Sequence, residues 1–185
     1  MQAIIDAIES GTLENCEITT VVSSKQGVFA LERAEKHGIH NVVISRKDFA
    51  DLSEFDAALC QHMEKHNVDL IVMAGFLSIV GEKLLARFEN RIINIHPSLL
   101  PKFGGKGFYG LKVHEAVLAA GEKTTGATVH FVNAEIDGGE IILQKSLEVK
   151  PNDTAETLQK RVMAECEQVI LVEAINLVRN EKLGI

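Results

Sequence analysis

The sequence has few cysteines, and their spacing does not match a metal site. Cys16, Cys60 and Cys166 are an odd number without the paired Cys-x-x-Cys arrangement of zinc-binding domains. Disulfide-rich secreted domains carry more cysteines, in even numbers. We therefore expect reduced thiols in a cytoplasmic protein.

Basic clusters and long apolar runs are also missing. Lys and Arg number 19 against 26 Asp and Glu, which gives a formal net charge of −7, and the basic residues are dispersed. This charge argues against a nucleic-acid partner. No apolar run reaches the roughly 20 residues of a membrane-spanning helix, and no signal peptide precedes the first predicted helix. A membrane partner is therefore not expected either.

What the sequence contains is typical of one globular domain. Its 185 residues are 46% hydrophobic and 24% charged, which suffices for a substantial core in a single domain over residues 1–185. Because strands alternate with helices through most of the chain, we predict an α/β fold with a mostly parallel sheet. The predicted helices are at 1–10, 28–37, 48–66, 82–88, 112–120 and 154–179, and the predicted strands are at 17–23, 41–45, 69–74, 91–96, 127–133 and 140–149.

The stretch at residues 91–102 begins as a short apolar strand that carries two polar side chains. Asn94 and His96 are two positions apart, so they share one face of the strand. Pro97 ends the strand because proline has no N–H to donate. An amide and an imidazole are thus expected side by side where a buried strand opens into a loop. Open α/β sheets place their binding sites at such strand ends.

Asp137, at an Asp-Gly-Gly turn, is a third polar candidate, although such turns are also common without any function. A carboxylate beside an imidazole favours the protonated ring and would supply a proton donor near neutral pH. Asn94, His96 and Asp137 together suit the addition of a nucleophile to a carbonyl. The amide and the imidazole would bind the developing oxyanion, and the carboxylate would tune His96. Ser and Cys nucleophile motifs are missing, so the nucleophile is expected to belong to the substrate.

The other histidines have weaker claims to function. His62 and His66 are four residues apart on a predicted helix, as metal ligands can be, but no third ligand is evident and an exposed helix edge is the expected role. His130 is expected in the core or behind the site, and His114 begins a helix where it can face either solvent or the site. The four glycines at 103–110 match no phosphate-binding motif and are expected to form a mobile lid or hinge.

Two motifs resemble those of the folate-dependent formyltransferases. They are Asn-Ile-His-Pro-Ser-Leu-Leu-Pro at 94–101, which is highly specific for that superfamily, and Asp-Gly-Gly at 137–139 after a Thr-Val-His-Phe-Val strand. The likeness covers essentially the whole chain. It implies a Rossmann-like three-layer formyltransferase fold without a metal. It also implies transfer of a formyl group from 10-formyltetrahydrofolate to the amine of 5'-phosphoribosylglycinamide in purine biosynthesis.

The same resemblance implies roles for individual residues. His96 would be the proton donor, Asn94 would orient the formyl oxygen, and Asp137 would raise the pKa of His96. Glu167 matches a contact to the ribonucleotide. The folate would lie against two segments and Asn94; the segments are Leu77, Ser78, Ile79 and Val80, and Asn133, Ala134, Glu135, Ile136 and Asp137. Both expected partners are small molecules, and a monomer or a homodimer is expected.

The chain differs from the family pattern at its start. Family members open with a central strand and a Gly/Ser/Asn loop that binds the substrate phosphate, whereas this sequence begins within the following helix, at Met1 and Gln2. We therefore expect the first, central strand to be missing and the domain to be N-terminally shortened. The alternatives are an enzyme of the methionyl-tRNA formyltransferase or formyltetrahydrofolate deformylase type, and a catalytically impaired folate-binding fragment.

Overall fold

The computed structural model describes residues 1–183. The chain forms two compact units. The first comprises Met1–Ile71 and Phe76–Arg91, and the second comprises Val72–Gly75 and Ile92–Ile185. This division does not test the expected single domain over residues 1–185, which stays a prediction.

The first unit contains a two-stranded parallel sheet, and helix α2 packs on both of its strands. Val22 of β1 lies opposite Val42 of β2. Both strands fall within the predicted ranges, but regular pairing is limited to three residues in each. The elements of this unit are α1 (Gln2–Glu9), β1 (Val21–Ser23), α2 (Phe29–Lys36), β2 (Asn41–Val43), the 3₁₀ turn η1 (Arg46–Asp48), α3 (Leu52–Lys65) and α4 (Glu82–Arg87).

Helices α3 and α4 are joined by a buried carboxylate. Asp56 of α3 is only 1% exposed, and its two oxygens accept hydrogen bonds from the backbone N–H groups of Gly81, Lys83 and Leu84 at 2.7, 2.8 and 3.2 Å. These N–H groups have no partner within α4 because they lie at its N-terminus. A carboxylate in this position also interacts favourably with the helix dipole. The predicted apolar stripe of α3 is buried at Phe55, Leu59 and Met63, whereas Leu52 is 39% exposed.

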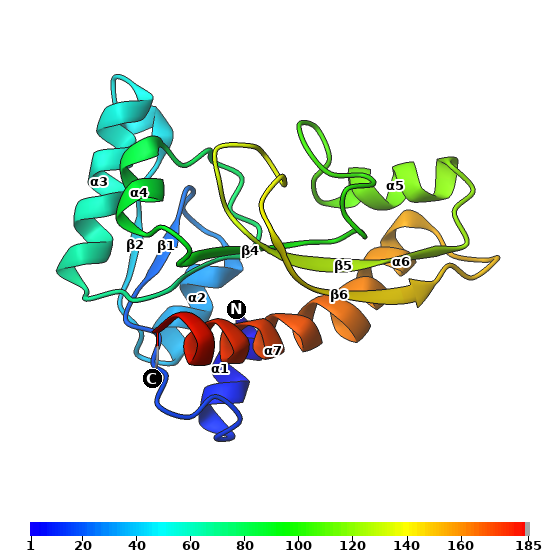
Figure 1. Cartoon of the computed structure of the whole chain (residues 1–185), viewed down its shortest axis with the longest axis horizontal. Helices are drawn as coiled ribbons and strands as arrows, with labels where there is room; N and C mark the ends of the chain where they lie inside the picture. The colour runs from blue at the N-terminus through cyan, green and yellow to red at the C-terminus, as the bar shows by residue number, and fades with distance from the viewer. Residues whose placement is uncertain (184–185) are drawn as a thin grey trace. The chain divides into compact units, whose positions relative to one another are not determined.

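The second unit is built on a four-stranded sheet in the order β3-β4-β5-β6. Figure 1 shows β5 and β6 as long neighbouring strands, with the last helices of the chain following them. The elements are β3 (Ile71–Met73, which starts at the last residue of a first-unit segment), β4 (Ile92–His96), α5 (Leu111–Ala119), β5 (Thr124–Phe131), β6 (Ile141–Glu148), α6 (Ala155–Val162), η2 (Met163–Glu167), α7 (Gln168–Val178) and η3 (Arg179–Leu183).

Strand direction is mixed. β1 and β2 are parallel, whereas β5 runs antiparallel to both β4 and β6. The predicted Rossmann-like α/β fold is confirmed, but the share of antiparallel pairing exceeds what a mostly parallel sheet implies. The physical reason is local for β5 and β6, because the connection at residues 132–140 contains no helix and returns the chain alongside the strand it has just left.

The closing helix runs without a break from α6 to η3, which extends the predicted helix at 154–179 by one turn. Thr154 caps its start: the Thr154 hydroxyl accepts from the N–H of Thr157, and the Thr157 hydroxyl accepts from the N–H of Thr154. Between α6 and α7 the segment η2 is wound as a π-helix, a feature often found at functional sites. The core under this helix consists of Val113, Val117, Ala127, Val129, Leu158, Val162, Cys166, Ile170 and Ala174, all at most 2% exposed.

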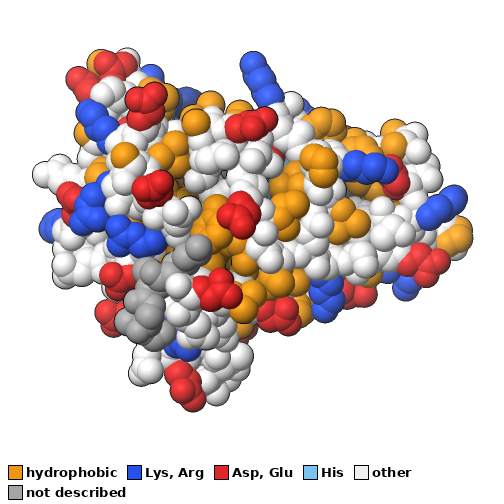
Figure 2. Space-filling view, viewed as in Figure 1, with side chains coloured by type: hydrophobic (Ala, Val, Ile, Leu, Met, Phe, Trp, Pro, Cys, Tyr) orange, Lys and Arg blue, Asp and Glu red, His pale blue; other side chains and the backbone are white. Residues whose placement is uncertain are grey.

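The surface is mixed in charge. On the face shown in Figure 2, acidic and basic side chains are interspersed over both units. This distribution agrees with the dispersed basic residues of a chain whose net charge is −7. Among residues 1–183, none of the helices combines the length and the apolar composition needed to cross a bilayer.

Candidate active site

Strand register brings four polar side chains to one face of the sheet in the second unit. Asn94 of β4 lies opposite His130 of β5, and His96 lies opposite Thr128. Because side chains two positions apart in a strand point the same way, both pairs share a face, as predicted for Asn94 and His96. His96, Thr128 and His130 are buried, and Asn94 is half-buried. The pairing therefore concentrates an amide, a hydroxyl and two imidazoles where β4 ends.

Hydrogen bonds indicate which ring nitrogen of His130 carries the proton. Its Nδ1 lies 2.8 Å from the carbonyl oxygen of Phe131, an acceptor, so Nδ1 carries the proton. Nε2 then has a lone pair and accepts from the amide nitrogen of Asn94 at 3.1 Å. An amide nitrogen has two hydrogens, so this contact uses one of them and leaves the second for another acceptor.

His96 is held between a backbone carbonyl and a carboxylate. Its Nε2 donates to the carbonyl oxygen of Phe103 at 2.8 Å, and its Nδ1 lies 3.5 Å from Oδ2 of Asp137. The side chains of His96 and Asp137 are only 5% and 12% exposed. The other oxygen of Asp137 lies 3.6 Å from Nε2 of His130, which places the carboxylate beside both imidazoles. The three predicted catalytic residues are thus brought together from a strand and a distant turn.

Burial sets the charge of this group. Loss of water around His96 lowers the pKa of its imidazole, and the hydrogen bond with Phe103 and the charge of Asp137 oppose this effect without cancelling it. Burial raises the pKa of Asp137, but its contacts with His130, the N–H of Gly105 and His96 outweigh burial and leave that pKa below its usual value. The expected raising effect of Asp137 on His96 is present, but the net direction is downward because the fold removes His96 from water. A neutral imidazole beside an ionised carboxylate is the resulting state near pH 7.

The turn that carries Asp137 depends on its glycines. Asp137 has a φ of +55°, a left-handed conformation that Asp tolerates better than most residues. A Cβ at Gly139 would collide with the carbonyl oxygen of Phe131, so the chain can pass there only without a side chain. Oδ2 of Asp137 accepts a hydrogen bond from the N–H of Gly105 at 2.9 Å. The Asp-Gly-Gly sequence therefore has a backbone reason as well as a chemical one.

The loop after β4 is supported by residues that sequence reasoning did not select. The Thr128 hydroxyl donates to the carbonyl of Ser98 at 2.7 Å and accepts from the N–H of Leu100 at 3.1 Å and from Nε2 of Gln144 at 2.9 Å. The Ser98 hydroxyl donates to the carbonyl of Lys102 at 2.7 Å. One sequence feature could have identified Thr128 as a residue of the site: it stands two residues before His130 in a predicted strand. The glycine-rich segment at 103–110 contacts His96 and Asp137 through Phe103 and Gly105, and its role as a lid stays a prediction.

His114 of α5 faces the interior. It is fully buried, and neither ring nitrogen has a hydrogen-bond partner among the described residues. Burial, with a smaller effect from His96, lowers the pKa of its imidazole to about 4. The sequence allowed His114 to face either solvent or the site. In the structure His114 is buried, and it interacts electrostatically with His96.

The residues expected to bind substrates are divided between the two units. Leu77, Ser78, Ile79 and Val80 belong to the first unit, in the irregular connection between β3 and α4. The segment of Asn133, Ala134, Glu135, Ile136 and Asp137 belongs to the second unit, where Oδ1 of Asn133 accepts from the N–H of Glu135 at 2.9 Å. Leu77, Ile79 and Ile136 expose 65%, 60% and 47% of their surface.

Glu167 lies in the π-helical segment η2, where it is half-buried. Burial raises the pKa of its carboxyl to about 7. Perturbed carboxyl groups cluster at functional sites, which keeps Glu167 a candidate for the predicted ribonucleotide contact.

Comparisons with known proteins show the family to which the chain belongs. The formyl transferase family profile matches residues 1–175. A phosphoribosylglycinamide formyltransferase from Haemophilus influenzae is 39% identical over 169 residues, which are 91% of this chain and 77% of that protein. The crystal structure of glycinamide ribonucleotide transformylase 1 from Symbiobacterium toebii has a TM-score of 0.87 at 39% identity and covers 94% of this chain and 79% of that one.

The chain also matches part of a much larger protein. It is 40% identical over 179 residues to the trifunctional purine biosynthetic protein adenosine-3 of Chironomus tentans. The match covers 96% of this chain but spans only 13% of that protein's length.

Fold, site and family profile together show that the chain belongs to the formyl transferase family. Two relatives that it matches over most of their length are a phosphoribosylglycinamide formyltransferase and a glycinamide ribonucleotide transformylase. The resemblance inferred from residues 94–101 and 137–139 is confirmed at the level of the family.

Proposed function

We propose that this chain transfers the formyl group of 10-formyltetrahydrofolate to the amine of 5'-phosphoribosylglycinamide, a step of purine biosynthesis. The observation that carries the proposal is the assembly of Asn94, His96 and Asp137, with Nδ1 of His96 3.5 Å from Oδ2 of Asp137, in a member of the formyl transferase family. The amine of the substrate supplies the nucleophile, in agreement with the missing Ser and Cys motifs.

The proposed reaction forms one bond and breaks another. The amine attacks the formyl carbon, and the carbonyl oxygen gains negative charge. The second N–H of the Asn94 amide, which His130 does not occupy, donates to this oxygen. A hydrogen bond to an anion is about twice as strong as one between neutral groups, so this contact stabilises the transition state more than the ground state. Collapse of the intermediate restores the carbonyl and breaks the bond to N10 of the folate.

Proton movement in this proposal uses His96 and Asp137. The amine must lose a proton, and N10 must gain one as it leaves. The lowered pKa of His96 makes the ring neutral before reaction, so it can accept the proton from the amine. The imidazolium that forms lies beside the Asp137 carboxylate, and it then donates the proton to N10. His96 thus fills the predicted role of proton donor after it has first acted as a base.

Exposed apolar side chains support the predicted folate contacts. In the first unit, Leu77 and Ile79 expose large apolar surfaces of the kind that suits a flat aromatic pterin. In the second unit, Ile136 is also exposed. Glu167 supports the ribonucleotide contact, because its carboxyl can accept hydrogen bonds from ribose hydroxyls. The assignments of Ser78, Val80, Asn133, Ala134 and Glu135 rest on the family resemblance. A metal-free reaction, a cytoplasmic location and a monomer or homodimer stay predictions.

The test is a formyl-transfer assay with three acceptors: 5'-phosphoribosylglycinamide, water and methionyl-tRNA. We expect transfer to the ribonucleotide, and His96→Ala should lower kcat by about 10²–10⁴-fold because general acid–base catalysis contributes that much. His37→Ala is a matched control: it removes a first-unit imidazole that pairs with Glu9 at 2.8 Å. Hydrolysis alone would indicate a deformylase, and transfer to tRNA the other formyltransferase type. Folate binding without any turnover would contradict the proposed activity and indicate the impaired fragment.

A further inference from the structure

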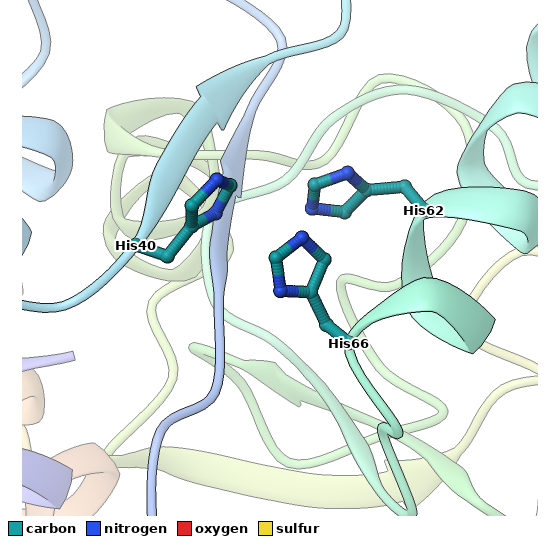
Figure 3. A group of neighbouring side chains, drawn as sticks. All are labelled: His40, His62 and His66. Carbon is teal, nitrogen blue, oxygen red and sulfur yellow. The ribbon is translucent and has the colours of Figure 1, made fainter.

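Three histidines of the first unit form a cluster that the proposed function does not use. His40 lies directly before β2, His62 lies in the last turn of α3, and His66 ends that helix. One ring nitrogen of each histidine lies within 4.8 Å of those of the other two. Figure 3 shows the rings gathered in one place, with nitrogens of His62 and His66 directed toward one another. Sequence spacing identified His62 and His66 only, because His40 is 22 residues away in the chain.

The nitrogens of the cluster converge and are short of partners. The hydroxyl of Thr20 lies 2.9 Å from Nε2 of His62 and 3.2 Å from Nδ1 of His40, so two rings point at one place. Nε2 of His66 is buried and has no hydrogen-bond partner among the described residues. Buried side-chain nitrogens in folded proteins nearly always have a partner. A bound cation would satisfy Nε2 of His66.

The geometry allows one ion to reach all three rings. Tetrahedral zinc sites have Zn–N distances of about 2.0–2.1 Å, which places their nitrogens about 3.4 Å apart. The widest separation of 4.8 Å would have to close by about 1.4 Å. His40 is exposed and the other two rings are half-buried, so side-chain rotation can supply this movement.

The chemistry of the donors selects the class of metal. All three donors are imidazole nitrogens, which bind metals through the ring nitrogen that carries no proton. A carboxylate is not among the three donors, and Lys65 repels cations. Mg²⁺ and Ca²⁺ prefer oxygen ligands and are disfavoured here, whereas Zn²⁺, Cu²⁺ and Ni²⁺ bind imidazole well.

We propose that His40, His62 and His66 form a binding site for a divalent transition-metal ion, with Zn²⁺ as the foremost candidate. The Thr20 hydroxyl or a water molecule takes the fourth position. The site joins the segments that precede β1 and β2 to the end of α3, so a bound ion links three parts of the first unit. Because an ion that binds only the folded state stabilises it by mass action, the metal raises the melting temperature. This inference does not depend on the proposed formyl transfer.

The test uses the full chain without a purification tag, stripped of metal with a chelator that is then removed by dialysis. Zn²⁺ is titrated in competition with a chromophoric chelator, and Co²⁺ is added to a second sample to record its absorption spectrum. We expect one Zn²⁺ per chain, a higher melting temperature with Zn²⁺, and a Co²⁺ spectrum of nitrogen ligation. His40→Ala should weaken binding by at least about 10–100-fold, the loss seen when even an outer-shell partner is removed.

Controls separate this site from other binding. His40 is exposed, so its replacement should leave the fold intact; circular dichroism checks this, and His66→Gln provides a second variant at the site. His37→Ala removes an imidazole outside the cluster and should bind Zn²⁺ as the unaltered chain does. Equal affinity in the His40 and His66 variants would overturn the proposal. A thiolate band in the Co²⁺ spectrum would do the same, because it would assign binding to Cys16 or Cys60, and so would the lack of saturable Zn²⁺ binding.

Discussion

The two units each contain three histidines that lie within electrostatic reach of one another, yet the two groups are built differently. In the second unit, His96, His114 and His130 are at most 4% exposed, and a carboxylate, Asp137, lies beside two of them. In the first unit, His40 is exposed and His62 and His66 are half-buried, and the partner is a hydroxyl, that of Thr20.

This difference determines what each group can do. A buried imidazole beside a fixed carboxylate can take up and release a proton, which suits acid–base chemistry. Imidazole nitrogens that converge beside a hydroxyl suit a transition-metal ion. The same side chain thus gains different functions from burial and from its neighbours. Four experiments, in decreasing order of the change each should produce, test whether the two groups differ in this way.

The largest effect is expected from Asp137→Asn, which removes the charge that distinguishes the second-unit group. The amide can still accept from the N–H of Gly105, so the turn should keep its shape. Without the carboxylate the imidazolium of His96 loses its counter-charge, and we expect kcat for formyl transfer to fall by about 10²–10⁴-fold. Steady-state kinetics measures this. Asp51→Asn, at the N-cap of α3 in the first unit, is the control and should change little, because Asn caps helices as well as Asp. A loss below threefold in Asp137→Asn would remove the carboxylate from the chemistry.

The next effect concerns the support of the second-unit site. Thr128→Val keeps the shape of the side chain but leaves the buried N–H of Leu100 without its acceptor. We expect the free energy of unfolding to fall by about 2–4 kcal/mol, since an unsatisfied buried group costs about 1–3 kcal/mol and two further hydrogen bonds are lost.

Thr125→Val is the matched control in the same strand. The Thr125 hydroxyl is buried without a hydrogen-bond partner among the described residues, so its removal should be neutral or stabilising. Denaturant unfolding of both variants gives the two values. Equal destabilisation would show that the Thr128 hydroxyl does not support the loop after β4.

The third test uses the pH dependence of stability to measure how well the second unit shields His114 from water. Burial lowers the pKa of His114 in the folded chain to about 4 from its ordinary value of 6.5. The unfolded state therefore binds more protons between these values, so stability is complete above pH 6.5 and falls as pH falls toward 4. The contribution of His114 to this fall is up to about 3 kcal/mol. His114→Leu should flatten the dependence and raise stability at pH 7. An unchanged pH profile would show that His114 is accessible to water when folded.

The smallest effect is expected from Glu167→Gln in the second unit. Burial raises the pKa of Glu167 to about 7, so its contribution to stability is complete below pH 4.5 and is lost as pH rises to 7. Glu167→Gln should therefore be more stable than the unaltered chain at pH 8, by about 1–2 kcal/mol after allowance for partial exposure. It should also lower kcat/KM for the ribonucleotide about tenfold, the worth of one hydrogen bond to a charged group.

Glu64→Gln is the first-unit control. Glu64 is 47% exposed and pairs with Arg87 at the surface, so its change should stay within about 0.5 kcal/mol at either pH. If Glu167→Gln behaved in the same way, the π-helical segment η2 would not enclose its carboxylate.

Short-range sequence patterns were sufficient to predict many features of this protein. Strand spacing placed Asn94 and His96 on one face, because side chains in a strand alternate whatever surrounds them. The Asp-Gly-Gly turn marked Asp137, and residues 94–101 were sufficient to indicate the family that the profile confirms. Helix spacing brought His62 and His66 together for the same kind of local reason. These inferences depend on short segments, whose geometry is set by the backbone.

The remaining features depend on contacts between segments that are distant in the chain. The antiparallel register placed Thr128 behind the loop after β4 and His130 against Asn94. Burial turned the pKa of His96 downward, although the carboxylate of Asp137 predicted the reverse. His40 joined His62 and His66 from a separate segment and completed a set of three donors. Burial and long-range contacts depend on how distant segments pack, and local spacing contains no measure of either.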